Sequence, residues 1–581
     1  MSEESKQTSY AKNMFLGEIS EEVLFPFPEM EKEERENLGL ILDTVNDFFK
    51  DKEADIAAWD ESGELPPDII TSLAELGLFS MLIPEEYGGL NLSNSAYSRI
   101  MGSLAYWDAG SVLTVGAHTS IGFKGLVLYG NDKQKAKYYP KLASGEMIAA
   151  FCLTEPSSGS DAASIQTKAV KDGDHWVLNG NKLWITNGGI ADFFTVFAKT
   201  EPVDGKKGKM TAFIVTKDLG GISTGAPEHK LGIRASNTTT VTFDNVRVPD
   251  ENVLGGVGQG FKVAMNILNN GRTGLGGGVV GGLRHLIKLS VHQSNERSQF
   301  GKQIKEYGLI KQKIGQMVLD TYVAESCAAV IGGMIDGGCE DFSMESAICK
   351  IYGSEVLWKN ASEALQIAGG NGYMKEFPYE RMLRDARINL IFEGTNEILR
   401  LFVGLSGLQE LGSYMKDLQS SLTGVFSDPI KGFGLFTDYA KKKIVRATNY
   451  GNEGFEQAHE SLKEEGKTII DCIGKLANAS ESLLKKYGKK IIGRQVSTAR
   501  IADMAIDCFT MSVTLSRVSK RIAEIGEEKA AQEIKILRTH IAQASYRVGQ
   551  LAQSIEKEED QWIKDLASHV DQKSEYPWDI I

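Results

Sequence analysis

Cysteine and histidine are scarce in this 581-residue chain, and neither is clustered. The six cysteines include no CxxC pair, and the eight histidines include no HExxH motif. Protein zinc sites draw their ligands from such closely spaced pairs, so we expect no structural zinc. Sparse and scattered cysteine is also typical of a reducing compartment.

Long apolar runs and excess positive charge are missing as well. No apolar run approaches the roughly 20 residues of a membrane-spanning helix. The formal net charge is −13, whereas nucleic-acid-binding surfaces are basic, so nucleic acid is not an expected partner. The N-terminal MSEESKQTSYAKNMF has neither the apolar segment of a signal peptide nor the composition of a mitochondrial presequence. We therefore expect a cytoplasmic protein of bacterial type, or one that has already lost a presequence.

The length and the residue patterns indicate several structural units, because a chain this long exceeds a single core. Helical periodicity dominates on both sides of a central region rich in β-branched residues, and Pro66 and Pro67 precede one helix start. The predicted fold is mainly α with a central antiparallel β domain and an additional C-terminal helical domain. We expect five parts: an irregular N-terminal arm (1–35), an α-helical domain (36–150), a middle β domain (151–262), an α-helical bundle (263–415) and the additional helical domain (416–581).

The central region contains short runs that alternate apolar and polar residues, such as HWVLNGNKLWITNG, FFTVFAKT, MTAFIVTK and TTTVTFDNVRV. Glycine, asparagine and aspartate separate them, which is typical of a compact antiparallel β unit. The later GGVGQG and GLGGGVVGG follow this unit and enter a helix, so neither fits the dinucleotide fingerprint, which follows a first β-strand. We interpret them as a flexible junction and a close helix–helix contact. The segment 423–437 is predicted to be a linker.

Three segments carry residues suited to chemistry, although each also has an ordinary explanation. FCLTEPSSGSDAAS (151–164) could line a polar ring or an anion with backbone N–H groups, or be a turn in which Ser160 or Asp161 caps a short helix. LWITNGG (183–189) could stack on a heteroaromatic ring, or be a strand ending in an Asn-Gly turn. RINLIFEGTNEILR (387–400) places Glu393 in a polar break, where it could equally be a loop acid near a helix start.

Together, and in this order, these segments resemble the acyl-CoA dehydrogenase family, most of all its very-long-chain branch. The resemblance covers about residues 15–415 and weakens beyond. It rests on the motifs CLTEPSSGSD, WITNGG, LGIRASNTTTVTFDNVRVPDENVLG, ERSQFGK, QIAGGNGY and IFEGTNEILR. The resemblance implies FAD-dependent α,β-dehydrogenation of an acyl-CoA to the trans-2-enoyl-CoA in fatty-acid β-oxidation.

The resemblance also implies cofactor-binding residues, in two groups. Within one subunit, the flavin would meet a wall, a strand end and a later turn. These are formed by Phe151, Leu153, Thr154, Gly159 and Ser160, by Trp184, Ile185 and Thr186, and by Thr395, Asn396 and Glu397. In the family, a second group comes from the neighbouring subunit and meets the pyrophosphate and adenosine end: Arg297, Phe300, Gln366, Gly369 and Gly370. A shared cofactor implies a homodimer or a higher homo-oligomer.

Glu393 matches the family's catalytic base. An acyl-CoA α-proton is weakly acidic, and a carboxylate whose pKa is raised toward neutrality suits its removal. In the family, the base's own backbone N–H and a flavin hydroxyl hold the thioester oxygen. One branch instead places its base at the position of Gly271, and a glycine cannot abstract a proton. Glu393 is therefore the expected base.

Substrate contacts are also implied by the resemblance. Ser160, Asn269, Arg272 and Gly394 match substrate-binding positions, although Asn269 replaces a family aspartate that meets CoA. Gly116, Gly122 and Gly125 lie in a region that bounds the acyl tail in the family. Their small size would leave room for a long chain, or would serve helix packing. The sequence alone leaves both interpretations open.

The expected partners are an acyl-CoA and electron-transfer flavoprotein. The C-terminal helical region resembles the extra domain of the very-long-chain branch, and its basic stretches KKKIVR and KKYGKKIIGR could contact an anionic membrane or be solvated helix faces. Two other functions share the same motifs: an acyl-CoA oxidase that passes electrons to oxygen, and a non-catalytic scaffold or assembly factor of the same fold.

Overall fold

The computed structural model describes residues 9–201, 209–423 and 455–578. Its contacts define two compact units. The larger unit comprises Pro28–Asn396, and the smaller unit comprises the chain up to Phe27 together with the chain from Glu397 onward. The residues proposed above for the base and most of the flavin contacts belong to the larger unit.

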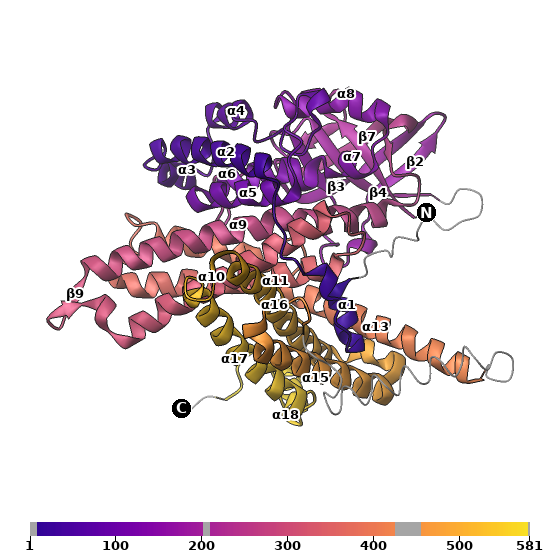
Figure 1. The fold of residues 1–581 in the computed structure, drawn as a ribbon. Helices are drawn as coiled ribbons and strands as arrows, with labels where there is room; N and C mark the ends of the chain where they lie inside the picture. Colours follow the sequence, from indigo (N-terminus) through magenta and orange to yellow (C-terminus); the bar gives the residue numbers. More distant parts are fainter. Residues whose placement is uncertain (1–8, 202–208, 424–454, 579–581) are drawn as a thin grey trace. The chain divides into compact units, whose positions relative to one another are not determined.

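The larger unit begins with a helical layer, as the sequence predicted for residues 36–150 (Figure 1). Proline occupies the first turn of α4, where its missing N–H costs no helical hydrogen bond. Asn131 and Gln134 form a reciprocal capping box at the start of α8, with N···O distances of 2.9 and 3.0 Å. The helices are α2 (Lys32–Asp51), α3 (Ile56–Ser62), α4 (Pro67–Glu75), α5 (Asn94–Trp107), α6 (Ala109–Gly116), α7 (Lys124–Tyr129) and α8 (Asp132–Ala143).

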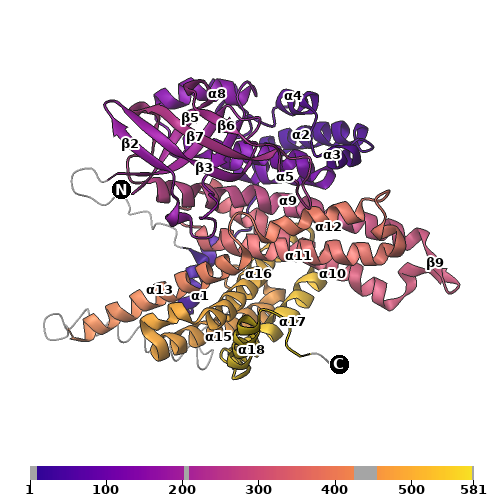
Figure 2. The same cartoon turned by 180° about the vertical axis from the view of Figure 1, so that it is seen from behind.

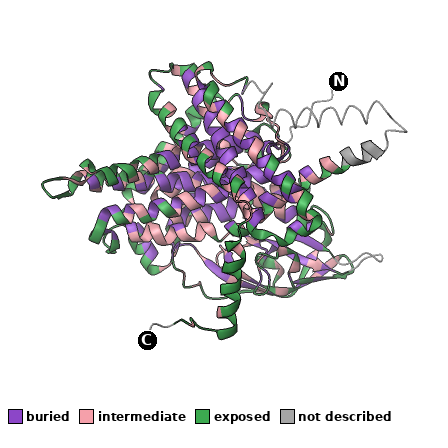
Figure 3. Cartoon of the chain, turned by 90° about the horizontal axis from the view of Figure 1, so that it is seen from below, coloured by how far each residue is buried: buried purple, intermediate pink, exposed green. Residues whose placement is uncertain are grey.

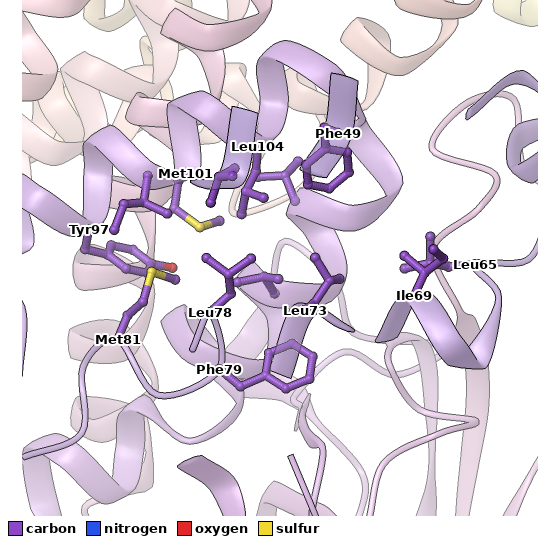
Figure 4. Close-up of a cluster of buried hydrophobic side chains, with 14 of the residues drawn as sticks. Phe49, Leu65, Ile69, Leu73, Leu78, Phe79, Met81, Tyr97, Met101 and Leu104 are labelled. Carbon is purple, nitrogen blue, oxygen red and sulfur yellow. The ribbon is translucent and has the colours of Figure 1, made fainter. Parts of the chain in front are cut away.

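One apolar cluster holds these N-terminal helices together (Figure 4). Phe49 of α2, Leu73 of α4 and Leu104 of α5 are fully buried and come from three different helices. Burial of each such side chain contributes about 1.5–3 kcal/mol, so the cluster accounts for much of the stability of the layer. Across the molecule, buried residues lie on the inward faces of the helices and exposed residues on the outward faces (Figure 3).

The middle of the larger unit is a β-sheet with the order β6-β7-β3-β2-β4-β5-β8, in which β1 also pairs with β4. Most neighbours are antiparallel, as predicted, but β1–β4 and β2–β4 are parallel. Alternating residues show that a strand has two faces and do not reveal its direction, which explains the difference. The strands are β1 (Ala149–Cys152), β2 (Lys168–Asp172), β3 (His175–Thr186), β4 (Phe193–Thr200), β5 (Met210–Thr216), β6 (Ile222–Thr224), β7 (Thr238–Pro249) and β8 (Val253–Leu254).

A second helical layer follows the sheet and includes the longest helix of the described chain. It contains α9 (Gly260–Glu296), α10 (Gly308–Asp336), α11 (Ser343–Ala368) and α12 (Tyr379–Arg387). A small hairpin of β9 (Ser298–Gln299) and β10 (Lys302–Gln303) joins α9 to α10. Figures 1 and 2 both show this hairpin at the end of α9 and α10 that is remote from the sheet.

Glycines of α9 allow its backbone to touch that of α5. A Cβ added to Gly277 would lie 1.9 Å from the carbonyl oxygen of Ser98, and one added to Gly281 would lie 1.9 Å from that of Gly102. Neither position has room for any side chain. The interpretation of GLGGGVVGG as a close helix–helix contact is therefore confirmed.

Two segments of the described chain are long and apolar enough to cross a membrane by length and composition alone. They are Ala109–Tyr129 and Gly308–Asp336, and 67% of the most apolar window of each is buried inside the protein. Core helices have this property too, so these segments are weak evidence for a membrane span.

The smaller unit is helical, and its N-terminal part corrects one expectation. Residues 1–35 were expected to be irregular, yet α1 (Tyr10–Leu16) is a helix and α2 already begins at Lys32. Tyr10 donates a hydrogen bond of 2.9 Å to Ser512 of α16. So short a helix is marginal in isolation and depends on tertiary packing, which local sequence does not reveal.

The other helices of the smaller unit come from the C-terminal part of the chain. They are α13 (Asn396–Thr423, whose first residue belongs to the larger unit), α15 (Lys463–Tyr487), α16 (Gln495–Ile525), α17 (Ala531–Gln553) and α18 (Glu559–Lys573). The expected boundary at 415/416 falls within α13. The expected linker at 423–437 lies outside the described residues, apart from Thr423.

We predict that Gly277→Ala destabilises the protein by roughly 1–3 kcal/mol, because its Cβ forces α5 and α9 apart. Gly278→Ala is the matched control, since its Cβ would meet only the Ala105 methyl group, at 3.7 Å. That variant is expected to be neutral or more stable by about 0.5–1 kcal/mol, the usual gain of alanine over glycine in a helix. Denaturant unfolding distinguishes the two, and equal stabilities would contradict the close contact.

Candidate active site

Glu393 lies in a short irregular segment between α12 and α13, in a backbone conformation that glutamate rarely adopts. Its φ is +56° and that of Gly394 is +91°. Arg272 of α9 donates to the Glu393 carbonyl oxygen from Nη2 (3.1 Å) and Nε (3.4 Å). Lys350 of α11 donates to the Gly394 carbonyl oxygen at 2.8 Å and to Asn396 Oδ1 at 2.7 Å. Two buried cations thus hold the strained turn.

The Glu393 carboxylate is not the acceptor in any of these bonds. Its Oε2 atom is buried and has no hydrogen-bond partner among the described residues. Burial raises the pKa of Glu393, and the charges of Arg272 and Lys350 oppose this shift without cancelling it. A carboxylate with a raised pKa and a free oxygen is suited to accept a proton.

Gly271 lies directly opposite this carboxylate. A Cβ added to Gly271 would be 3.9 Å from Glu393 Oε2 and 2.9 Å from Cγ2 of Ile121. The two positions at which the resemblance allows a base therefore face each other, and of these two residues only Glu393 has a carboxylate.

A π-helical turn, η3 (Ala117–Gly122), lies between the base and the sheet. Ile121 would meet the missing Cβ of Gly271 on one side, and a Cβ on Gly122 would lie 2.8 Å from Cβ of Ala149 on the other. Ala149 opens β1, which leads into the predicted flavin wall at Phe151. The turn at 117–122 thus brings the predicted flavin wall (151–164) close to the segment that carries Glu393 (387–400).

The strand end at Trp184 is shaped by a β-bulge. The pairing of β3 with β7 shifts between Lys182 and Ile185, and Trp184 has a φ of +56°. A bulge turns a side chain away from the regular pleat, and the Trp184 ring is 63% exposed. The Asn-Gly turn expected after this strand is present, with Asn187 at a φ of +63°.

A buried ion pair joins the flavin wall to this strand. The Lys182 ammonium donates to Glu155 Oε1 (2.8 Å) and to the carbonyl oxygens of Phe197 (2.8 Å) and Leu153 (3.3 Å). Burial works to raise the pKa of Glu155, but the charge and hydrogen bond of Lys182 and two backbone N–H groups bring it below its usual value. Leu183 N also donates to Thr154 O at 3.0 Å. The two segments are thereby fixed side by side.

The exposed parts of these segments fit a flavin. Gly159 and Ser160 are exposed, and the structure records no hydrogen bond from their backbone N–H groups to another described residue. Thr154 and Thr186 are partly exposed and can offer hydroxyl groups. Free donors next to an exposed aromatic ring suit a planar polar cofactor.

Some residues predicted to bind the cofactor face the protein core instead. The side chains of Leu153 and Ile185 belong to the two apolar clusters of the β domain, so they can present only backbone atoms to a cofactor. Phe151 is partly buried, and its ring centroid is 5.1 Å from that of Phe197. Thr395 is partly exposed, and Glu397 is exposed in the first turn of α13.

The second predicted group lies far from Glu393 within one chain. Arg297 and Phe300 lie at the β9–β10 hairpin, and Phe300 is 95% exposed with a φ of +53°. At a rise of 1.5 Å per residue, α9 places Arg297 about 39 Å from Gly271. Gln366, Gly369 and Gly370 are exposed at the C-terminal end of α11, about 24 Å along that helix from Lys350. These residues therefore do not contact Glu393 of the same chain.

The predicted substrate residues Asn269 and Arg272 have structural partners. Arg272 Nη1 donates to Asn269 Oδ1 at 2.8 Å, and Asn269 O accepts from Ser346 Oγ at 2.8 Å. Arg272 therefore positions the Glu393 turn. The carbonyl oxygen of Gly394 is the second one held by a buried cation, Lys350.

The glycines of the expected acyl-tail region leave no open space. A Cβ on Gly122 would lie 2.5 Å from Ala117 O, one on Gly125 would lie 2.7 Å from Leu254 Cδ2, and one on Gly116 would lie 3.2 Å from Met101 Cε. The structure thus favours helix packing over room for a substrate at these positions.

Sequence reasoning missed Lys350, Lys182 and the role of Glu155. Lys350 is a charged residue inside an otherwise mainly apolar stretch, SAICKIYG, whereas Lys182 and Glu155 stand next to polar or turn residues. Lysine and glutamate are almost never fully buried unless paired. For Lys350, a lone charge in a core segment was therefore the available signal, but it does not reveal the partner.

Comparisons with known proteins agree with this geometry. Models described as the acyl-CoA dehydrogenase N-terminal, middle and C-terminal domains match residues 35–146, 150–246 and 258–407, and the ACAD9/ACADV C-terminal domain matches 460–576. The chain belongs to the acyl-CoA dehydrogenase family, a class of FAD-dependent oxidoreductases.

Individual relatives cover most of the chain. The human mitochondrial very long-chain specific acyl-CoA dehydrogenase is 44% identical over 97% of this chain and 86% of its own length. A Bacillus anthracis acyl-CoA dehydrogenase crystallised with FAD has a TM-score of 0.78 and 31% identity, covering 98% of this chain and 96% of that chain. Butyryl-CoA dehydrogenase from Megasphaera elsdenii has a TM-score of 0.62 and 34% identity, and the match covers 65% of this chain and 98% of that chain.

We predict that Lys182→Met destabilises the protein by about 3–5 kcal/mol, because Glu155 is left charged and unpaired in the interior. The double variant with Glu155→Gln is expected to recover part of this loss. Denaturant unfolding measures both effects, and the flavin absorbance of the purified protein reports whether the wall still binds cofactor. Equal stability of wild type and Lys182→Met would show that the ion pair is not structural.

Proposed function

We propose that this protein dehydrogenates acyl-CoA thioesters between Cα and Cβ, yielding the trans-2-enoyl-CoA, and that Glu393 removes the α-proton. The observation that carries the proposal is the free, buried Oε2 of Glu393 opposite Gly271. Bound FAD supplies the acceptor for the β-hydride, which protein side chains cannot provide.

The residues of this chain would orient the substrate and hold the proton. Glu393 Oε2 accepts the α-proton, and Arg272 and Lys350 keep its turn in place by bonding to backbone carbonyls. No hydrogen bond is recorded for the Glu393 backbone N–H within the described residues, so it can donate to the thioester oxygen as negative charge develops there.

A long acyl chain is the proposed substrate class. The support is the 44% identity to a very long-chain specific enzyme and the matching C-terminal domain. The tight packing around Gly122 and Gly125 means that any long cavity must be bounded by other residues.

The proposed quaternary state is a homodimer or a higher homo-oligomer. The exposed Phe300 hairpin and the exposed Gln366–Gly370 region cannot reach the Glu393 of their own chain, and another subunit could use both. Electron-transfer flavoprotein is the proposed electron acceptor, by family relationship.

Peripheral membrane contact through the C-terminal domain is also proposed, on the basis of its exposed lysines. KKKIVR lies outside the described residues. In KKYGKKIIGR, Lys485 pairs with Glu481 and Lys486 pairs with Glu556 at 2.7 Å, so two of its cations already have protein partners. Lys489 and Lys490 are exposed and could contact lipid.

We predict that Glu393→Gln lowers kcat by about 10²–10⁴-fold while FAD and acyl-CoA still bind, because only the proton acceptor is lost. The exposed Glu376→Gln, in the turn before α12, is the control and should keep full activity. Steady-state turnover and flavin absorbance measure the two properties. Near-normal turnover of Glu393→Gln would place the base elsewhere.

The pH dependence follows from the raised pKa of Glu393. The base works only when deprotonated, so activity should rise with pH through a pKa above the ordinary 4.5. The same shift makes the folded state less stable as pH rises from 4.5 toward the folded-state pKa, because the unfolded chain ionises first. Glu393→Gln should remove this part of the pH dependence of stability.

We predict that C16 and C18 acyl-CoAs bleach the bound flavin faster than C4 acyl-CoA in anaerobic single turnovers. A sharp preference for C4 would contradict the long-chain proposal. Rapid reoxidation in air with release of peroxide would favour the oxidase alternative, and a folded, flavin-loaded protein that no acyl-CoA reduces would favour the scaffold alternative.

A further inference from the structure

A loop between β6 and β7, residues 228–237, links parts of the larger unit that the proposed mechanism needs to align. We refer to it as the bridging loop. It is internally cross-linked: Lys230 Nζ donates to Ser236 O at 2.7 Å, and Ser236 Oγ donates to Ile233 O at 2.8 Å. Ile233 has a φ of +50°, which is unfavourable for a β-branched residue. Such strain persists only where the surroundings impose it.

Helix α12 imposes this strained backbone conformation on Ile233. The backbone N–H of Ile233 donates to the Asp385 carboxylate. Arg384 Nη1 donates to Leu231 O at 3.1 Å, and a Cβ added to Gly232 would lie 2.4 Å from the Arg384 carbonyl carbon. Arg384 is itself held by Asp60 at 2.8 Å. The bridging loop is therefore pressed against α12, backbone to backbone.

At its other end the bridging loop supports the turn that follows Trp184–Thr186. Asn237 O accepts a hydrogen bond of 2.8 Å from Asn187 N, and Asn237 Oδ1 accepts one of 2.8 Å from Gly189 N. Thr238, the next residue, pairs with Thr186 in the sheet. The position of Asn237 thus determines the position of the turn at 187–189.

Helix α12 continues toward Glu393 with little interruption. Asn389 Nδ2 donates to Asp385 O at 3.3 Å, and Phe392 N donates to Ile388 O at 3.1 Å. Helix α12 ends at Arg387 and is followed by the 3₁₀ turn η9 (Ile388–Leu390), and Glu393 lies three residues beyond this turn. Asp385 is therefore in the last turn of the helix that leads to the proposed base.

We propose that Asp385 is a positioning residue that fixes the Trp184–Thr186 strand end relative to Glu393 through the bridging loop. The connection runs from Asp385 to Ile233 and from Asn237 to Asn187 and Gly189. The inference rests on the proposed roles of Glu393 and of Trp184–Thr186. Proton removal and hydride departure occur on adjacent carbon atoms, so the base and the flavin-contacting residues must be held in register.

The proposed positioning role of Asp385 requires that its side chain accept a hydrogen bond, and it does not require a negative charge. Burial raises the pKa of Asp385 to about 7, and the nearby carboxylates of Asp60 and Asp108 raise it further, whereas the Ile233 N–H and Arg381 lower it. Both protonation states keep an oxygen that can accept from Ile233 N–H. Asparagine keeps this acceptor as well, so Asp385→Asn separates positioning from charge.

The test compares Asp385→Ala, Asp385→Asn and Asp336→Ala as full-length proteins loaded with FAD. Asp336 is the matched control, because it accepts hydrogen bonds from Asn94 N (2.7 Å) and Ser95 N (3.0 Å) at the start of α5, away from the bridging loop. One readout is hydrogen–deuterium exchange of peptides that contain Asn187 and Gly189, without substrate. The other is the rate of flavin reduction by palmitoyl-CoA in an anaerobic single turnover.

We expect faster exchange at 187–189 in Asp385→Ala and flavin reduction slowed by about 10–100-fold, since a 1 Å displacement can cost about 100-fold. Asp385→Asn and Asp336→Ala should resemble wild type in both readouts. Unchanged exchange in Asp385→Ala, an equal defect in Asp385→Asn, or the same defect in Asp336→Ala would each overturn the proposal.

A second variant covers the case in which Asp385→Ala does not fold. Asn237→Ala removes the acceptor for Gly189 N–H at the other end of the bridging loop and should change both readouts in the same direction. Normal exchange and normal reduction in Asn237→Ala would overturn the proposal. The exchange readout needs no substrate, so it stands even if the base proves to be a residue other than Glu393.

Discussion

Two buried cations donate hydrogen bonds to backbone carbonyls around Glu393 and not to its carboxylate. The proposed chemistry of the site depends on this arrangement. Arg272 and Lys350 donate to the carbonyl oxygens of Glu393 and Gly394. An ion pair with the carboxylate would have lowered its pKa and occupied its oxygens. Because the cations bind the backbone instead, they stabilise a strained turn and leave Oε2 free in a desolvated place. These contacts thus fix the geometry of the turn, whereas burial, opposed by the two positive charges, raises the pKa of Glu393.

Close backbone contacts position α9, the helix that carries Arg272. Arg272 comes from α9, whose contact with α5 depends on Gly277 and Gly281. The π-helical turn at 117–122 then fills the space between α9 and the first strand of the sheet. Side chains at these glycines would force α5 and α9 apart. The packing of α9, which carries Arg272, therefore depends on residues outside the site.

In the segments predicted to bind flavin, some residues are buried and support the structure, and others are exposed and can contact a ligand. The pair Lys182–Glu155 is buried and joins the wall to the strand, while Gly159, Ser160 and Trp184 remain exposed to meet a ligand. Buried ion pairs are weak evidence for net stability, but they specify one arrangement well, because any other leaves a charge unpaired. By contrast, the Phe300 side chain is 95% exposed at the hairpin that follows α9.

The sequence by itself determined the class of fold and the order of the helical and β-rich regions. Local patterns carry this information, since helical and strand periodicity are properties of neighbouring residues. The prediction of Glu393 as the base came from the resemblance of several motifs taken together, because the EGTN break alone also fits an ordinary loop. The sequence did not reveal α1, the parallel pairing of β1 and β2 with β4, or the partners of Lys350 and Lys182. It also left the role of Gly122 and Gly125 open, which packing then decided. Each of these depends on residues far apart in the chain, and only the tertiary structure decides which distant groups meet.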